Sequence, residues 1–391
     1  MVSVRLEDTF ISEPPQSLVL EKGFRFQHGD VIAPFTIVYE TFGKFDGSNA
    51  ILVCHALTPG AHVAGKYAPS DTKPGWWDGM VGYGKAIDLD KHFVVCVNFP
   101  GSPWGTTAPH SIDPATGQPY GSRYPWITVE DMVESQRIVA DHLGIARFAC
   151  VVGSSLGGMQ VLMWAVRYPS RVGSLIAMAA SAAVPVASVG WHLIGRKLIQ
   201  SDPEFHGGDY YSNPAPLRGL QLARMVGQMT YLSNEALDRK FGRRRRDGTR
   251  QFEVDSYLEY QAQKFGSAFD ANSYIRVQAA MDEMDLEEQY GTLAAAFRRF
   301  RSRALLVSFD TDWLFPAIEM ARVHDAMRSV EIDAVHNTIT TPNGHDAFLI
   351  DYHLITPVVR EFLAEHASAG CELASTSTQV AHSAHPADER Q

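Results

Sequence analysis

The fold of this chain is decided by residues 149–160, which read ACVVGSSLGGMQ. The apolar run at 149–152 is typical of a buried strand, and residues 159–168 are typical of a buried helix that ends before Pro169. The glycines of the intervening G-x-S-x-G pattern let strand and helix pack closely, while the central serine occupies a strained turn with an exposed hydroxyl. This arrangement, a nucleophile elbow, makes Ser155 the candidate nucleophile. A glycine-rich turn without chemistry is the alternative, and other residues must decide between the two.

Composition limits the class of protein. The chain has 391 residues, of which 45% are hydrophobic, enough for one large domain with an insertion or for two domains. A net charge of −10 argues against nucleic-acid binding, and the basic run at 243–246 precedes Asp247 and Gly248 as in a solvated loop. No apolar run approaches ~18 residues and no secretory leader opens the chain, so we expect neither a membrane span nor export. The four cysteines lack CxxC spacing, which favours free thiols in a reducing, cytoplasmic setting.

Strand signals recur along the chain and alternate with helical ones. The strand-like runs cover residues 23–26, 36–41, 50–55, 90–98, 149–152, 174–178, 304–309 and 330–335. Several of these runs are continuously apolar, which is typical of parallel strands that are buried on both faces. Helices are predicted after the capping-box residue Thr128 and after Pro316, whereas the Pro-rich residues 1–20 are expected to be irregular. The pattern predicts an α/β protein with a mostly parallel central sheet and helices on both faces.

A helical insertion interrupts this alternation. Runs such as 220–232 and 255–265 have helical spacing, and no strong strand signal occurs near them. The last residues, rich in Ala, Ser, Thr and His, are typical of disorder. The predicted organisation is an α/β core at residues 1–183 and 301–366, a helical lid insertion at 184–300 and a disordered tail at 367–391.

Acidic and basic candidates for a serine mechanism follow the predicted strands. A serine hydroxyl needs a histidine base within hydrogen-bond reach and a carboxylate that fixes the imidazole tautomer. Asp310 and Asp312 follow the strand at 304–309, and His345 lies in the loop after the last strand. The chain order of serine, aspartate and histidine is that of α/β-hydrolases. The residues alone leave both aspartates as candidates.

Ten short segments, in one order along the chain, carry a resemblance to a known family. They are CHAL (54–57), KPGWWD (73–78), IDPATG (112–117), GSSLGGMQ (153–160), LARM (222–225), TYLS (230–233), KFGR (240–243), FDANSY (269–274), DWLFP (312–316) and GHDAFL (344–349). To about residue 366, the chain resembles the homoserine O-acyltransferase family, α/β-hydrolase-fold enzymes of methionine biosynthesis that are called homoserine O-acetyltransferase in most members. So many segments in one order make the match specific.

The resemblance implies a role for each matched position of the catalytic machinery. It places the nucleophile on Ser155, the acid on Asp312 and the base on His345. It also places an oxyanion hole on the backbone N–H groups of Leu57 and Leu156. This choice of acid favours Asp312 over the other aspartate.

Three further residues are implied to bind the substrate: Arg224, Tyr231 and Asp346. A planar guanidinium at Arg224 can hold the carboxylate of an amino acid through two hydrogen bonds. Asp346 can supply an acidic partner for the α-ammonium group beside the base. Without the resemblance, Arg224 would be interpreted as a surface charge on an amphipathic helix and Asp346 as an ordinary loop residue.

The expected reaction is transfer of an acetyl group from acetyl-CoA, as a co-substrate, to L-homoserine through an acyl-serine. Succinyl transfer, a serine acceptor and an esterase activity are the alternatives. No bound cofactor is implied, and no clustered His, Cys or carboxylate motif indicates a metal. The resemblance further implies a homodimer that assembles through the helical insertion.

The chain departs from the commoner family pattern near the expected site. Residues 100–105 read PGSPWG where a loop rich in glycine and cysteine is usual, and Pro59 replaces a glycine. Gln228 replaces a histidine, and residues 191–193 read WHL where many members have an Asn-Glu pair. These departures concern the choice of acceptor and donor more than the triad.

Overall fold

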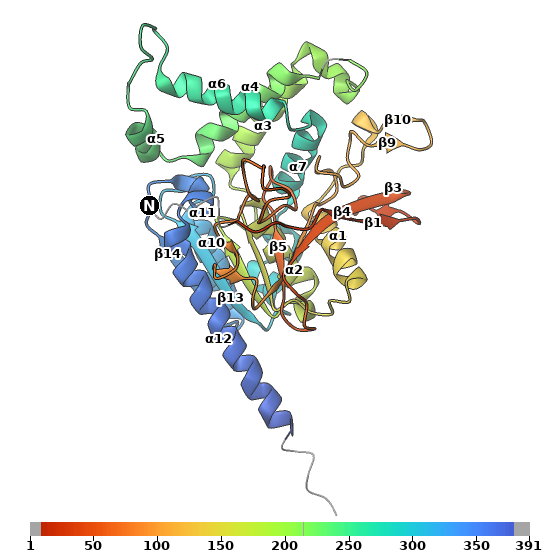
Figure 1. Cartoon of the computed structure of the whole chain (residues 1–391), viewed down its shortest axis with the longest axis vertical. Coiled ribbons are helices and arrows are strands. Elements are labelled where there is room, and N and C mark those ends of the chain that lie inside the picture. Colours follow the sequence, from red (N-terminus) through yellow and green to blue (C-terminus); the bar gives the residue numbers. More distant parts are fainter. Residues whose placement is uncertain (1–8, 214, 379–391) are drawn as a thin grey trace, which may run out of the picture.

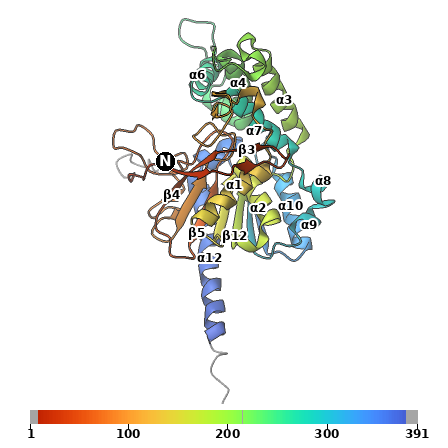
Figure 2. The same ribbon diagram turned by 90° about the vertical axis from the view of Figure 1, so that its right-hand side faces the viewer.

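The computed structural model describes residues 9–213 and 215–378. It consists of an α/β body with a layer of helices above one end of its sheet, and a long C-terminal helix that projects from the opposite end (Figure 1). Figure 2, turned by 90°, shows the same helical layer above the sheet. The two views together place the insertion over one edge of the sheet.

The central sheet has eight strands in the order β1-β4-β8-β5-β11-β12-β13-β14. In that order they are Gln16–Leu20, Phe35–Phe42, Phe93–Val97, Ala50–Cys54, Cys150–Ser154, Ser174–Met178, Arg303–Phe309 and Ala334–Ile339. The pairings of β1 with β4 and of β4 with β8 are antiparallel, and the others are parallel. The carboxyl ends of six parallel strands therefore meet at one edge.

Short strand pairs and helices complete the body. The pairs are β2 (Phe24–Arg25) with β3 (Val31–Ile32), β6 (Val81–Gly82) with β7 (Ile87–Asp88), and β9 (Ile112–Asp113) with β10 (Gln118–Pro119). The helices of the body are α1 (Val129–His142), α2 (Leu156–Arg167), α10 (Ala317–Ser329), α11 (Ala347–Ile350) and α12 (Tyr352–Thr378). Thr128 caps α1 with the predicted capping box, because its hydroxyl and the Asp131 side chain each accept from the other residue's N–H.

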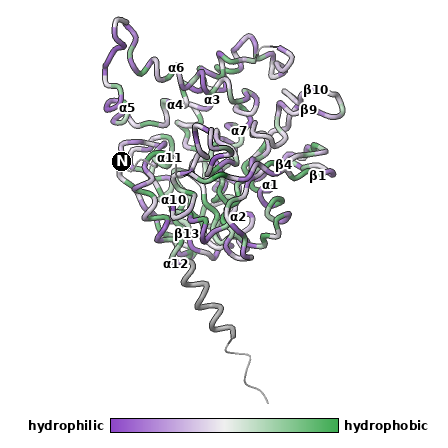
Figure 3. The backbone as a smooth tube through the Cα atoms, viewed as in Figure 1, coloured by the Kyte–Doolittle hydropathy of each residue, from purple (hydrophilic) through white to green (hydrophobic). Residues whose placement is uncertain are grey.

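Both faces of the sheet are buried. On β5, Leu52 and Cys54 pack into a cluster that includes α1, α2 and α10, whereas Ile51 and Val53 pack into a second cluster that includes α12. Because side chains alternate along a strand, a sheet that is covered on both sides needs continuously apolar strands. The tube in Figure 3 accordingly carries much of its hydrophobic colour in the body. The prediction of a mostly parallel sheet with helices on both faces is confirmed.

Helices α3 to α9 occupy the range predicted as the insertion. They are α3 (Val186–Gln200), α4 (Leu217–Tyr231), α5 (Asn234–Lys240), α6 (Glu253–Gly266), α7 (Ala271–Glu283), α8 (Leu286–Tyr290) and α9 (Leu293–Phe297). A separate apolar cluster, including Ile199, Leu220, Phe265 and Tyr274, holds α3, α4, α6 and α7 together. The insertion thus has a core of its own, which fixes the positions of the side chains that it presents to the sheet. Of the helices described, none is long and apolar enough to cross a membrane.

The sequence-based prediction of secondary structure is wrong at two places. Residues 16–20 form the edge strand β1 instead of irregular chain, stabilised by antiparallel pairing with β4; residues 1–8 lie outside the described range. The last strand is Ala334–Ile339 rather than 330–335. Glu331 has a left-handed φ of 63°, and the N–H of Ile332 donates to the carbonyl of Met327, so these residues complete the end of α10.

The C-terminal prediction is tested only in part. Helix α12 extends to Thr378, into the range predicted as a disordered tail, and residues 379–391 lie outside the described residues. Cys54, Cys96 and Cys150 are free and buried, as predicted from the strand-like runs that contain them.

Candidate active site

The turn between β11 and α2 is the strained elbow that the sequence predicts. Ser155 stands alone between the two elements with φ 57° and ψ −130°, a conformation that costs a residue with a side chain on the order of 1–3 kcal/mol. A Cβ at Gly157 would lie 2.1 Å from the carbonyl oxygen of Cys54, and a Cβ at Gly153 would lie 2.5 Å from that of Gly157. Both positions therefore require glycine. The Ser155 N–H donates to the Met178 carbonyl at 3.0 Å, which holds the turn against β12.

Three side chains from separate loops form one hydrogen-bonded chain. His345 Nε2 lies 2.9 Å from Ser155 Oγ, and His345 Nδ1 lies 2.7 Å from Asp312 Oδ2. Asp312 follows β13 and His345 follows β14, so the shared edge of the parallel strands brings the three together. All three are buried, with exposed fractions of 7% or less. This is the geometry that activates a serine hydroxyl through a histidine base.

The second oxygen of Asp312 is fixed by the backbone. Its Oδ1 accepts hydrogen bonds of 2.9 Å from the N–H groups of Leu314 and Phe315. The carboxylate therefore cannot rotate away from the imidazole without losing both bonds. Asp310, the competing candidate, is exposed and accepts instead from the N–H of Thr341. The structure places only Asp312 against His345.

The environment of His345 favours its protonated form. Burial opposes the imidazolium, but the carboxylates of Asp312 and Asp346 outweigh it and raise the pKa of His345 above its usual value. The Asp312 hydrogen bond also fixes the tautomer, because Nδ1–H donates to the carboxylate and leaves Nε2 to accept from Ser155. A base held in this way can take the serine proton as the oxygen attacks.

Two backbone N–H groups adjoin the serine. Leu156 is the first residue of α2, so its N–H has no partner within the helix, and Leu57 lines the same cavity as Ser155. In the described chain, neither N–H donates to another residue. The loop that carries Leu57 is held on both sides, since Gln160 Nε2 donates to the His55 carbonyl at 3.0 Å and Trp104 Nε1 to the Thr58 carbonyl at 3.0 Å.

A small cavity extends from Ser155 into the insertion. Its walls come from the loop after β5, the elbow, helices α3, α4 and α7, and the loop after β13. The lining residues are Leu57, Ser155, Trp191, His192, Ala223, Val226, Gly227, Thr230, Tyr231, Tyr274, Gln278, Met281 and Leu314. The helical layer thus roofs the serine and narrows the access of water to it.

Arg224 on α4 is a partly buried cation that forms no ion pair with any described residue. Its guanidinium lies 5.2 Å from the ring centroid of Tyr231 and 4.8 Å from that of Phe265. Its Nε and Nη1 atoms are buried and have no hydrogen-bond partner among the described residues. Burial raises the pKa of Tyr231, although the Arg224 charge opposes the shift. Unsatisfied guanidinium donors in such a place fit a carboxylate supplied by a ligand.

Asp346 lies beside this cation and the histidine. Burial raises the pKa of its carboxyl, whereas the charges of His345, Arg224 and Lys240 oppose the increase. No side chain in the described ranges donates to the Asp346 carboxylate. An acid with free acceptor oxygens next to an arginine with free donors provides complementary partners for an amino acid.

Comparisons with known proteins agree with this geometry. A family model described as the alpha/beta hydrolase fold matches residues 49–350. The homoserine O-acetyltransferase of Deferribacter desulfuricans is 43% identical over 350 residues, 88% of this chain and 93% of that protein. The homoserine O-succinyltransferase of Burkholderia multivorans is 43% identical over 373 residues, 91% of this chain and 98% of that protein.

The chain belongs to the homoserine O-acyltransferase family.

A solved structure gives the same result for the fold. The homoserine O-acetyltransferase from Bacillus anthracis matches with a TM-score of 0.84 and 29% identity, over 90% of this chain and 98% of that one. The predicted family and its α/β-hydrolase fold are confirmed. The relatives carry both acetyltransferase and succinyltransferase names, so the comparisons leave the acyl group open.

The structure also brings residues to the site that the sequence did not single out as partners. His192 lines the cavity, and its Nδ1 lies 2.6 Å from Asp282 Oδ1, while Arg196 pairs with the other Asp282 oxygen at 2.5 Å. The Oε1 atoms of Gln278 and Gln228 are buried without a partner among the described residues. In the sequence, the only signs of these contacts were the departures from the family pattern at 191–193 and at Gln228. The pairing of His192 with Asp282 could not be predicted, because α3 and α7 are far apart in the chain.

We expect acyl transfer to be lost as the pH falls through the pKa of His345. The neutral imidazole is the base, and its raised pKa places the loss above the ~6.5 of an ordinary histidine. Asp312→Asn should shift the midpoint to lower pH and reduce the rate, because burial would then be opposed only by Asp346. The measurement is the pH dependence of thiol release from acyl-CoA in the first turnover. A midpoint that lies below ~6.5, or does not move in the variant, would contradict the assignment.

Proposed function

We propose that this chain transfers the acetyl group of acetyl-CoA to the hydroxyl of L-homoserine, giving O-acetyl-L-homoserine, through an acetylated Ser155. The observation that carries the proposal is the hydrogen-bonded chain of Ser155, His345 and Asp312 beneath a roof that holds the unpaired guanidinium of Arg224. The chemistry requires no metal, and no cluster of ligands that could hold one occurs among the described residues.

The first half-reaction acylates the enzyme. His345 Nε2 accepts the proton of Ser155 while Oγ attacks the thioester carbonyl, and Asp312 stabilises the imidazolium that forms. The N–H groups of Leu57 and Leu156 are proposed to stabilise the oxyanion of the tetrahedral intermediate. Collapse of this intermediate releases coenzyme A, whose thiolate takes the proton from His345, and leaves an ester on Ser155.

The second half-reaction repeats the first with another nucleophile. His345 removes the proton of the acceptor hydroxyl, the oxygen attacks the acyl-serine carbonyl, and Ser155 regains its proton as the product leaves. Water is the competing nucleophile. The roof over the cavity disfavours water, and a bound amino acid holds its hydroxyl in line for attack.

The charges around the cavity support an amino-acid acceptor. The Arg224 guanidinium is proposed to bind the acceptor carboxylate, with Tyr231 packed against it, and the Asp346 carboxylate to bind the α-ammonium. With the carboxylate held, serine would place its hydroxyl about 1 Å short of the acyl carbon, because it lacks one methylene of homoserine. A misplacement of that size can cost on the order of 100-fold in rate.

The lining of the cavity supports acetyl rather than succinyl as the transferred group. A succinyl group would bring a second carboxylate into the cavity, and that charge would need a cationic partner. Arg224 is proposed to bind the acceptor carboxylate, the residues that line the cavity include no lysine or arginine, and His192 is already paired with Asp282. An acetyl group places no such demand on the cavity.

We further propose a cytoplasmic homodimer that assembles through the insertion. Exposed apolar side chains on α3 support this surface: the neighbours Leu193 and Ile194 are 48% and 45% exposed, and Val186, at the start of the same helix, is 88% exposed. A sedimentation measurement that finds a monomer would exclude the dimer.

The preferred substrates can be measured with two donors and two acceptors. Acetyl-CoA and succinyl-CoA are each combined with homoserine and serine, and products are identified by mass. We expect the highest kcat/KM for acetyl-CoA with homoserine. Preference for succinyl-CoA would refute the choice of donor, and preference for serine would indicate that Pro59, which has no N–H and a fixed φ, shifts the oxyanion turn. Thioester hydrolysis unaffected by either acceptor would indicate a hydrolase.

Arg224→Ala should separate the two half-reactions. It removes the proposed carboxylate clamp, so the transition state for homoserine should lose roughly 2–4 kcal/mol of stabilisation, measured as a fall in kcat/KM. Acylation of Ser155 should stay nearly unchanged. Arg218→Ala is the matched control, because Arg218 is an exposed arginine on the same helix. Equal losses in both half-reactions would mean that Arg224 supports the fold or binds coenzyme A.

A further inference from the structure

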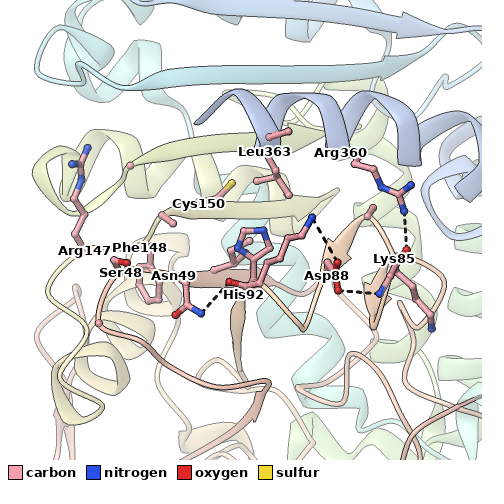
Figure 4. Close-up of a pocket in the computed structure, with 18 of the residues that line it drawn as sticks. Ser48, Asn49, Lys85, Asp88, His92, Arg147, Phe148, Cys150, Arg360 and Leu363 are labelled. Carbon is pink, nitrogen blue, oxygen red and sulfur yellow. Dashed lines mark hydrogen bonds and ion pairs between the residues drawn. The ribbon is translucent and has the colours of Figure 1, made fainter. Parts of the chain in front are cut away.

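A second, larger cavity lies at the opposite edge of the sheet from Ser155. It has a volume of about 1150 Å³, and its walls include the segments that enter β5, β8 and β11 (Figure 4). Cys150 and Ser155 stand at the two ends of β11, which separates the cavity from the serine by roughly 15 Å at ~3.3 Å per residue. Pockets of roughly 300–1,000 Å³ hold small organic ligands, so the space is sufficient for one. It takes no part in the chemistry at Ser155.

The floor of this cavity is apolar. Ile51, Phe148 and Cys150 come from the sheet, and Leu363 comes from α12, which packs across them. All four are buried, with exposed fractions of 8% or less. They expose almost no surface to water, so covering them contributes little, and Leu363, the most exposed of the four at 8%, is the apolar side chain that a ligand would contact most.

The rim of the cavity is cationic. Its ionisable residues are Lys85, Lys91, His92, Arg147 and Arg360, with Asp88 as the carboxylate. Arg147 lies at one end in Figure 4, and Arg360 and Lys85 lie at the other. This is an unusual concentration of positive groups in a chain whose net charge is −10.

The two arginines are the groups whose charge is least compensated. Arg147 donates to the Val172 carbonyl at 3.3 Å and to the Ser302 hydroxyl at 3.2 Å, and Arg360 donates to the Gly84 carbonyl at 2.8 Å. Neither forms an ion pair with a carboxylate of the described side chains. Both are therefore free to bind an acidic group.

Of the other ionisable groups at the rim, the two lysines lie near carboxylates, whereas His92 favours its neutral form. Lys85 pairs with Asp78 at 2.7 Å, and Lys91 lies 4.0 Å from Asp88. Burial lowers the pKa of His92, and its buried Nδ1 has no hydrogen-bond partner in the described chain. The cavity thus offers an apolar floor, two guanidinium groups that form no ion pair with a described residue, and one unsatisfied ring nitrogen.

We propose that this cavity is a binding site for a small amphipathic organic anion. The apolar body of the ligand lies against Leu363, and its acidic group is bound by Arg147 or Arg360 through charge-assisted hydrogen bonds. A ligand with an acidic group at each end would engage both arginines. The site is separate from the acyl-transfer centre, so it stands whether or not the proposed acyl transfer is correct.

The probe is 8-anilinonaphthalene-1-sulfonate, a sulfonate on an aromatic body, titrated calorimetrically into the full chain. We expect saturable binding at a single site, weakened roughly tenfold in one of the two variants Arg147→Ala and Arg360→Ala, whichever removes the arginine that binds the sulfonate. Arg147→Lys should retain most of the affinity. Arg301→Ala is the matched control, because Arg301 is also exposed, also donates to backbone carbonyls and lies outside the cavity. Unchanged binding in both alanine variants would overturn the proposal.

Two further arms locate the probe and test the role of charge. The uncharged analogue N-phenyl-1-naphthylamine should bind at least about tenfold more weakly, and equal affinity would overturn the anionic site. Prior labelling of Ser155 by a serine-directed reagent should leave sulfonate binding unchanged. Loss of binding after labelling would place the probe at the acyl-transfer cavity and overturn the assignment. Thermal unfolding of each variant confirms that the fold is retained, as expected for an exposed Arg147.

Discussion

The backbone contact between Gly157 and β5 is the constraint on which the site depends. The first turn of α2 passes so close to the Cys54 carbonyl that a Cβ at position 157 would lie 2.1 Å from its oxygen. This contact fixes the start of α2 and confines Ser155 to its strained conformation, φ 57° and ψ −130°. It also sets the N–H of Leu156 beside the serine and the loop of Leu57 next to it. One close approach thus positions Ser155 and the N–H of Leu156, for which we propose the roles of nucleophile and oxyanion donor.

The remaining groups of the site follow from the order of the parallel strands. β11, β13 and β14 end at one edge, and the loops that follow them carry Ser155, Asp312 and His345. Asp312 is held by two backbone N–H groups, so the charge that supports His345 is rigid as well as close. Such preorganisation lets the imidazole accept a proton without reorganisation at the moment of reaction. The insertion, which has its own apolar core, then closes the cavity over the serine.

Local pattern and resemblance together anticipated the centre of the site. The glycines around Ser155 specify the elbow by sterics, and the chain order of serine, aspartate and histidine follows from strand ends, so both were visible in the sequence. The choice of Asp312 over Asp310 came from the resemblance, and the two backbone hydrogen bonds to Asp312 now supply its physical reason. The roles of Arg224 and Asp346 stay predictions, although the unpaired Nε and Nη1 atoms of Arg224 agree with its role.

Contacts between distant segments could not be predicted in the same way. The strand β1 depends on pairing with β4, and the start of β14 depends on how α10 ends at Glu331. The pair of His192 with Asp282 joins helices that are 90 residues apart. The cationic cavity collects residues from five parts of the chain, none of which carries a recognisable motif. Periodicity indicates what an element is, but tertiary packing decides which side chains meet.

The most direct test is the mass of the peptide that contains Ser155 after incubation of the chain with acetyl-CoA alone. An acetyl group on Ser155 that is lost when L-homoserine is added, with formation of an equal amount of O-acetyl-L-homoserine, is the predicted result. The Ser155→Ala variant should remain unmodified under the same conditions. Acetyl transfer to homoserine that proceeds at the normal rate without any acetyl group on Ser155 would contradict the covalent mechanism.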